Sequence, residues 1–109
     1  MEFQDTLRHQ GLRKRLVEGI RIKGIKDEKV LAAIGKVPRH LFMDSSFIQF
    51  AYKDQAFPIG AGQTISQPFT VAMQTHLLQV ERHDKILEVG TGSGYQAAVL
   101  LEMGAAVYT

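Results

Sequence analysis

Three glycines at alternate positions follow an apolar run and an acidic residue in the last quarter of the sequence. The apolar run covers residues 85–89 and contains Glu88, which lies two residues ahead of the first glycine, Gly90. Gly92 and Gly94 follow it. A helical pattern of apolar residues follows the last glycine directly. Glycine permits positive φ and lets a ligand approach the main chain closely, while a helix start offers unpaired N–H groups. The pattern predicts a buried strand, a turn and a helix that together form a nucleotide-type site.

The spacing of these glycines narrows the class of ligand. A dinucleotide fingerprint needs a glycine at the sixth position of the motif, where this sequence has Tyr95. The sequence also lacks the Gly-Lys-Ser/Thr triplet of a phosphate-binding P-loop. The negative charge of Glu88 disfavours a polyphosphate and favours a cationic ligand. The alternative is a turn that binds nothing, although three glycines would weaken a turn kept only for stability. Tyr95 can line the ligand site or pack in the core, and both readings stay open.

A second polar segment covers residues 60–68 and precedes a predicted helix. Its sequence, GAGQTISQP, carries the hydroxyls of Thr64 and Ser66 beside glutamine amides. Hydroxyls, amides and main-chain N–H groups at a helix start suit a carboxylate ligand. Ser66 can also be simply the N-cap of the following helix. The two roles are compatible, because one hydroxyl can cap a helix and face a ligand.

Several predicted elements must position these two segments. Helices are expected over residues 6–18, capped by Asp5 or Thr6, over 28–35, capped by Asp27, and over 67–80. Residues 39–50 are weakly helical, and residues 19–24 form a loop or short extended link. Residues 51–67 have no helical period and predict a long ordered loop. The third helix is expected to bury Val71, Leu77 and Leu78. Strands are expected over residues 85–89 and from residue 105, with a helix to residue 103 between them.

This order of elements predicts an α/β fold, in which N-terminal helices precede the start of a Rossmann-like sheet. One domain, residues 1–109, is expected to contain a helical part (1–50), a substrate or cofactor loop (51–67) and the start of the sheet core (68–109). Parallel sheets are normally built from several βαβ units and covered on both faces. The sequence therefore predicts a domain that is truncated after its first βαβ unit begins. A free sheet edge of this kind favours self-association.

Composition places the chain among ordinary globular proteins and excludes some functions. The hydrophobic content is 45%, the charged content is 22%, and the net charge of +2 is too small to indicate a nucleic-acid partner. No apolar run is long enough to span a membrane. Cysteine is absent, and the four histidines have no metal-ligand spacing, so no metal site is predicted. The cytoplasm is the simplest compartment.

The two motifs together resemble the protein-L-isoaspartate O-methyltransferase family. That family pairs Gly-x-Gly-Gln-Thr-Ile-Ser-Gln-Pro with Leu-Glu-Ile/Val-Gly-Thr-Gly-Ser-Gly-Tyr-Gln-Ala, and both stand here at residues 60–68 and 87–97. The glycine motif alone resembles motif I of S-adenosylmethionine-dependent methyltransferases in general. The segment VPRHLF at residues 37–42 also matches, and the resemblance runs from about residue 27 to residue 109. Departures are Ala-Phe at residues 56–57, where bacterial members commonly have Pro-Leu, and the absence of the family's C-terminal half.

The resemblance implies transfer of a methyl group from S-adenosylmethionine to the isoaspartyl carboxylate of damaged proteins, as a step of protein repair. Such a carboxylate is ionised at neutral pH, so no strong general base is required. Ser66 is the implied active-site residue, with a hydrogen bond to the substrate carboxylate. The implied cofactor-binding residues are Gln63, Thr64, Ile65, Ser66, Glu88, Gly90, Gly92 and Gly94.

Two alternatives are a different S-adenosylmethionine-dependent methyltransferase on the same fold and a non-catalytic truncated fragment. The segment at residues 63–68 favours the isoaspartyl enzyme over other methyltransferases, because the glycine motif alone does not distinguish them. The expected truncation predicts that the 109-residue chain alone is inactive.

Overall fold

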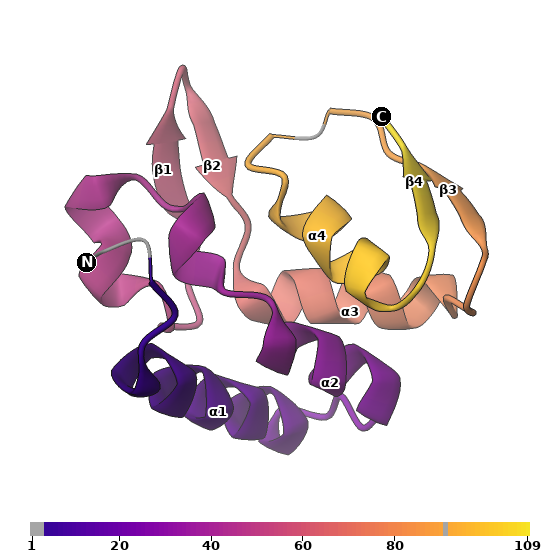
Figure 1. Ribbon diagram of the computed structural model, residues 1–109, viewed down its shortest axis with the longest axis horizontal. Coiled ribbons are helices and arrows are strands. Elements are labelled where there is room, and N and C mark those ends of the chain that lie inside the picture. The colour runs from indigo at the N-terminus through magenta and orange to yellow at the C-terminus, as the bar shows by residue number, and fades with distance from the viewer. Residues whose placement is uncertain (1–3, 91) are drawn as a thin grey trace.

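The computed structural model describes residues 4–90 and 92–109 (Figure 1). The elements, in which η marks a 3-10 helix, are α1 (Leu7–Ile22), α2 (Glu28–Lys36), η1 (Arg39–Phe42), η2 (Ser45–Phe50), β1 (Phe57–Gly60), β2 (Gln63–Ile65), α3 (Pro68–Leu78), β3 (Lys85–Leu87), α4 (Tyr95–Glu102) and β4 (Ala106–Tyr108). In Figure 1, α1 and α2 lie at the bottom, with the β1–β2 hairpin and the β3–α4–β4 unit standing above them. No helix among these residues is both long and apolar enough to cross a bilayer.

The N-terminal helices begin where the sequence predicts. The Thr6 hydroxyl accepts a hydrogen bond from the His9 N–H at 3.2 Å, and Asp27 caps α2 through the Lys29 N–H at 3.1 Å. The predicted end of the first helix is wrong, because α1 continues through Gly19 to Ile22. The side chain of Ile20, which lies in this added part of the helix, is fully buried. That burial outweighs the cost of about 1 kcal/mol for a glycine inside a helix.

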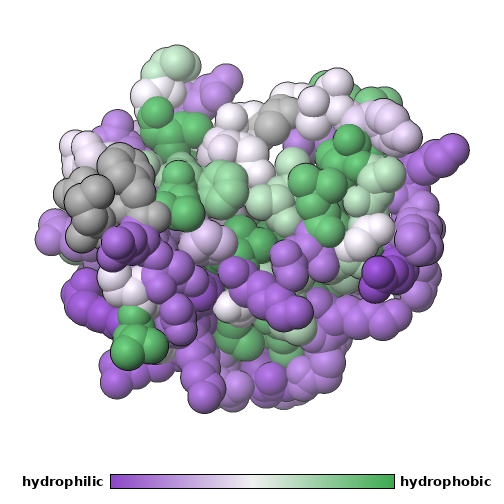
Figure 2. Space-filling model, in the orientation of Figure 1, coloured by the Kyte–Doolittle hydropathy of each residue, from purple (hydrophilic) through white to green (hydrophobic). Residues whose placement is uncertain are grey.

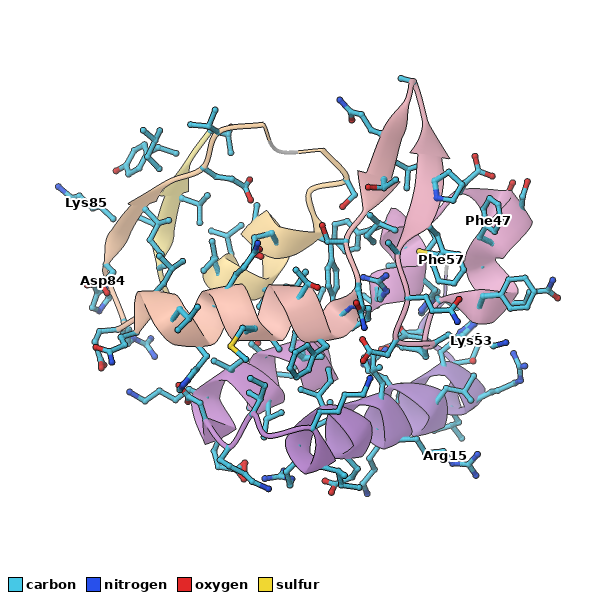
Figure 3. All side chains as sticks on the ribbon, turned by 180° about the vertical axis from the view of Figure 1, so that it is seen from behind. Arg15, Phe47, Lys53, Phe57, Asp84 and Lys85 are labelled. Atoms are coloured by element: carbon cyan, nitrogen blue, oxygen red, sulfur yellow. The ribbon has the colours of Figure 1, made fainter. Side chains whose placement is uncertain are left out.

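Residues 51–67 are not a loop throughout, and the prediction of a segment without secondary structure is wrong. β1 and β2 pair as an antiparallel hairpin, with Phe57 opposite Ile65. The connection is Ala61-Gly62, whose φ angles of 53° and 70° are positive at both positions, as in a type I′ turn. Phe57 and Ile65 are buried, and they attach the hairpin to the core. Phe47 of η2 packs on Phe57 with a centroid separation of 5.8 Å (Figure 3).

β3 and β4 are parallel and are joined by α4, as the sequence predicts. The prediction of a buried strand over residues 85–89 is wrong for its outward side chains: Leu87 is 74% exposed and Val89 is 88% exposed. Within the described residues β3 pairs with β4 alone. Only the Ile86 side of the pair is covered, by a small cluster of Val80, Leu100 and Ala105.

The main core lies between α1, α2, α3, α4 and the hairpin. Its fully or almost fully buried members include Ile20, Val30, Ile34, Val71 and Val99, each of which stabilises the fold by about 1.5–3 kcal/mol relative to an exposed side chain. Val71 is buried as predicted. The same prediction is wrong for Leu77 and Leu78, which are exposed. Figure 2 shows apolar side chains over the hairpin and the β3–α4–β4 unit and a largely hydrophilic surface over α1.

Candidate ligand-binding cleft

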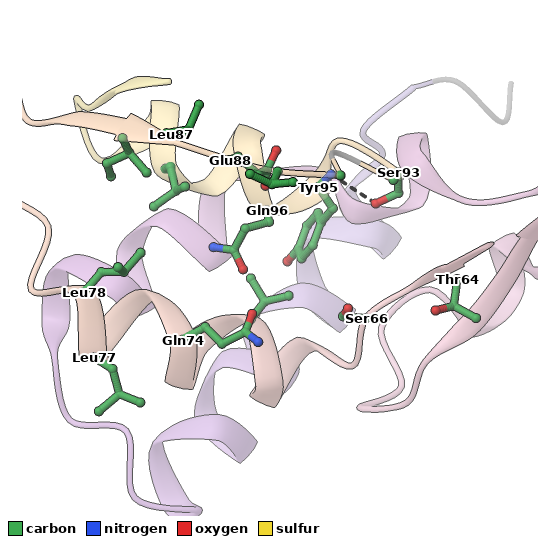
Figure 4. Close-up of a pocket in the computed structure, with 16 residues that line it drawn as sticks. Thr64, Ser66, Gln74, Leu77, Leu78, Leu87, Glu88, Ser93, Tyr95 and Gln96 are labelled. Carbon is green, nitrogen blue, oxygen red and sulfur yellow. Dashed lines mark hydrogen bonds between the residues drawn. The ribbon is translucent and has the colours of Figure 1, made fainter. Parts of the chain in front are cut away.

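A cleft of about 550 Å³ lies between the glycine turn, β3, α3 and the end of the hairpin (Figure 4). This volume is within the usual range for small-molecule sites. The cleft is lined by Thr64, Ser66, Val71, Gln74, Leu77, Leu78, Ile86, Leu87, Glu88, Val89, Gly90, Gly92, Ser93, Tyr95, Gln96 and Leu100. The two polar segments singled out in the sequence therefore meet at one surface.

The glycine turn follows β3 and leads directly into α4. Gly90, Gly92 and Gly94 have φ angles of 73°, 57° and 83°, in the left-handed region that favours glycine. A Cβ built on Gly92 would lie 4.0 Å from the Thr64 carbonyl oxygen. The turn and the hairpin therefore approach each other with main chain, rather than side chains, between them. No side chain of Gly90 or Gly92 therefore stands between the main chain and a ligand in the cleft.

Two buried acceptor oxygens belong to side chains that line the cleft. Glu88 Oε1 and Gln96 Oε1 are buried and accept no hydrogen bond from any residue that the structure describes. The orientation of Gln96 follows from its neighbour: the Thr75 hydroxyl donates to the Val71 carbonyl at 2.7 Å, so it can only accept from Gln96 Nε2, also at 2.7 Å. A ligand that brings N–H groups or positive charge would compensate such acceptors. The predicted preference for a cationic ligand therefore fits these side chains.

Gln96 is a cleft residue that the sequence reasoning did not include. Its signal is a single amide side chain at the second position of a helix, YQAAVLLE, in which the next five residues are all apolar. A polar residue at such a position needs a partner, and Thr75 on α3 supplies one of them.

The hydroxyl end of the cleft is formed by Thr64 and Ser66. The prediction that Ser66 caps the third helix is wrong, because the N-cap position of α3 is Gln67 and its side chain makes no capping bond. Asp54 acts in its place: its Oδ1 accepts a hydrogen bond from the Phe69 N–H at 2.8 Å. Ser66 is exposed and lines the cleft, so the start of α3 does not need its hydroxyl.

Tyr95 combines the two roles that the sequence left open: it packs in the core and it lines the cleft. Its side chain is 1% exposed. Phe42 meets it edge-on with a centroid separation of 5.8 Å. Burial raises the pKa of Tyr95 to about 12. The phenol is therefore neutral at physiological pH and is not a base there.

Three of the predicted cofactor-binding residues lie outside the cleft lining. Gln63 is exposed on the hairpin, and Ile65 is fully buried in the core. Gly94 is the N-cap of α4, and a Cβ there would lie 3.9 Å from the Phe42 ring. Over residues 4–90 and 92–109, no group of three or more His, Cys, Asp or Glu side chains is arranged to hold a metal ion.

Comparisons with known proteins point to one family. Residues 11–108 match the family model described as Protein-L-isoaspartate(D-aspartate) O-methyltransferase (PCMT). The chain is 64% identical over 107 residues to a protein-L-isoaspartate O-methyltransferase of Christiangramia forsetii, and 65% identical over 107 residues to one of Flavobacterium johnsoniae. Each match covers 98% of this chain and 50% of the relative, so the chain spans about half the length of these curated relatives.

Solved structures of the same description share the fold. One protein-L-isoaspartate O-methyltransferase aligns over 87% of this chain and 32% of its own, with a TM-score of 0.75 and 26% identity. A beta-aspartate methyltransferase (PCMT) from Plasmodium falciparum, in complex with S-adenosyl-L-homocysteine, aligns over 87% of this chain and 46% of its own, with a TM-score of 0.73 and 27% identity. These likenesses confirm the predicted α/β fold, with N-terminal helices ahead of a methyltransferase-type βαβ unit.

Proposed function

The chain belongs to the protein-L-isoaspartate(D-aspartate) O-methyltransferase family, and from that premise we propose that it serves in methyl transfer from S-adenosylmethionine to the carboxylate of isoaspartyl residues in damaged proteins. The observation that carries this proposal is the cleft in which the turn from Glu88 to Gly92 meets Thr64 and Ser66. One side of the cleft offers main chain and acceptors, and the other offers hydroxyls. A cation and a carboxylate can therefore be held side by side.

The cofactor end of the cleft is the glycine turn. S-adenosylmethionine, when bound, would supply an activated methyl group on a sulfonium centre. Glu88 and Gln96 present buried acceptor oxygens that suit the positive and N–H-bearing parts of such a ligand. Gly90 and Gly92 present no side chain to the cleft, so that the ligand can lie against the main chain at these two positions. Gln63, Ile65 and Gly94 remain proposed as supporting residues that act through the main chain.

The substrate end is formed by Thr64 and Ser66. A carboxylate is already ionised at neutral pH, so these residues need not remove a proton from it. We assign to the Ser66 hydroxyl a hydrogen bond to that carboxylate, supported by its exposure in the cleft and by the absence of a capping role. Such a bond would align the attacking oxygen with the methyl group.

A chimera tests the proposed function, because a relative can supply the half of its sequence that this chain does not cover. This chain replaces the segment that it matches in the Flavobacterium johnsoniae relative, which is 65% identical over 107 residues. Transfer of a labelled methyl group is then measured on a peptide with one isoaspartyl residue and on the same peptide with normal aspartate. We expect methylation of the isoaspartyl peptide alone. A chimera that binds S-adenosylmethionine yet methylates neither peptide would favour another substrate and overturn the proposal.

We also propose self-association of the 109-residue segment, supported by its exposed apolar side chains. Leu77 of α3, Leu87 of β3 and Val89 line the cleft and are 71%, 74% and 88% exposed. Light scattering at several concentrations should give a mass above that of one chain. A monomer mass at every concentration would contradict it. The cytoplasmic location remains a prediction of the sequence.

A further inference from the structure

Arg39 is a fully buried arginine that forms no ion pair with any residue the structure describes. Its exposed fraction is 0%, and burial lowers the pKa of its guanidinium. No carboxylate of the described residues lies within 4.0 Å of its nitrogens. Burying a cation without a counter-ion is costly, and an apolar side chain of similar size would avoid that cost. Packing alone therefore does not account for an arginine at this position.

The donors of Arg39 hold both ends of one turn. Its Nε donates to the Ala51 carbonyl at 2.9 Å, and its Nη2 donates to the Gln55 carbonyl at 3.0 Å. Residues 51–55 carry Asp54, whose Oδ1 accepts from the Phe69 N–H in the first turn of α3. A series of hydrogen bonds therefore connects Arg39, through the turn at residues 51–55, to the start of α3, which directly follows the Ser66 segment.

The same guanidinium also lies over the ring of Tyr95, which lines the cleft. Its central carbon is 4.9 Å from the centroid of the Tyr95 ring, a cation–π geometry. Tyr95 directly follows Gly94 and lines the cleft. Phe42, from the same 3-10 helix as Arg39, packs on the edge of this ring. One side chain thus contacts Tyr95 on the cleft wall directly, and reaches the start of α3 indirectly through the turn at residues 51–55 and Asp54.

We propose that Arg39 is a positioning residue, which fixes the glycine turn relative to the Ser66 segment and so sets the affinity of the cleft for its cofactor. A planar guanidinium is suited to this, because it can bond two carbonyls in its plane and stack on a ring with its face. The ligand side of this inference rests on the proposed function. Arg39 itself touches neither cofactor nor substrate.

Binding of S-adenosylhomocysteine to the chimera tests this role. Arg39→Lys and Arg39→Met should each raise the Kd at least 10-fold in calorimetry, because neither replacement can bond both carbonyls and stack on Tyr95. Arg13→Met is the matched control. Arg13 is also buried, at 4% exposure, and it bonds the Gly35 carbonyl and the Tyr52 hydroxyl. Unlike Arg39, it bonds neither of the two carbonyls that bound the turn and makes no contact with the Tyr95 ring. This variant should lower Tm and leave the Kd within twofold. An unchanged Kd in the folded Arg39 variants, or an equal rise in the control, would overturn the inference.

Hydrogen exchange supplies a readout that needs no ligand. The Phe69 amide depends on Asp54, and through it on the turn that Arg39 holds. Arg39→Lys should speed exchange of this amide by at least 10-fold relative to amides in the middle of α1; an unchanged rate would refute the positioning role. If Arg39→Met does not fold, the Kd and the Phe69 exchange rate of Arg39→Lys decide the inference. Failure of the unsubstituted chimera to bind S-adenosylhomocysteine would refute the proposed function instead, and the Phe69 exchange rate would still decide this inference.

Discussion

Replacing Ser66 by alanine separates a substrate role from a structural one. The hydroxyl is proposed to hold the substrate carboxylate, and a hydrogen bond to a charged group contributes about 1.5–3 kcal/mol. Each 1.4 kcal/mol is a factor of ten, so kcat/KM for an isoaspartyl peptide should fall by about 10-fold to 150-fold in the chimera. Affinity for S-adenosylhomocysteine should change much less, because the glycine turn forms the cofactor end of the cleft.

The stability of the Ser66→Ala variant decides between the two roles. Ser66 is exposed, and Asp54 rather than Ser66 bonds the start of α3. The free energy of unfolding should therefore change by no more than about 0.5 kcal/mol. Asp54→Ala is the matched variant, since loss of a capping carboxylate costs about 0.5–2 kcal/mol. Normal turnover together with a lowered Tm in Ser66→Ala would refute the reasoning and return Ser66 to a structural role.

Three further outcomes are expected. Gly92→Val should raise the Kd of the chimera for S-adenosylhomocysteine at least 10-fold, because φ is +57° at this position and a branched side chain would stand in the cleft; an unchanged Kd from calorimetry would remove the turn from the site. The free energy of unfolding should fall on acidification. Burial holds the pKa of His40 below its usual 6.5, and the hydrogen bond from Arg13 holds the pKa of Asp5 below 3.8, so the unfolded chain binds more protons than the folded one. The His40 contribution is complete above pH about 6.5 and is lost below it, and the Asp5 contribution is lost below pH about 3.8; Tm should decline from pH about 7 to 5, less so in His40→Gln, and a flat profile would contradict this. The 109-residue segment alone should bind S-adenosylhomocysteine more weakly than the chimera, because Leu87 on the cleft wall is 74% exposed; equal Kd values would show that the segment suffices.

The sequence predicts those elements of the fold that are specified by a few neighbouring residues. The Asp27 cap of α2 and the strand–glycine–helix unit around Gly92 stand where the pattern placed them. A cap, a turn and a helix start depend on a few adjacent residues, so they can be read without knowledge of the rest of the fold. The meeting of the glycine turn with Ser66 was expected from the family resemblance rather than from periodicity.

The missed features depend on contacts between distant residues or on an uncommon backbone conformation. Ala61 adopts positive φ in the hairpin turn, a conformation more typical of glycine or asparagine, so no turn signal was visible. Gly19 lies inside α1 because Ile20 is buried against other elements. Asp54 bonds the Phe69 N–H and so caps α3, although this helix begins fourteen residues further along the chain, at Pro68. Sequence spacing alone does not reveal a capping residue that is distant in the sequence and is brought to the helix by the tertiary structure.

The location of the bound cofactor product tests the central claim most directly. A crystal structure of the chimera with S-adenosylhomocysteine should show the ligand in the cleft, against the main chain of Gly90 and Gly92, with Glu88 Oε1 accepting a hydrogen bond from it. Thr64 and Ser66 should border the sulfur end of the ligand. Ligand density at any other surface, with this cleft filled only by solvent, would contradict the account.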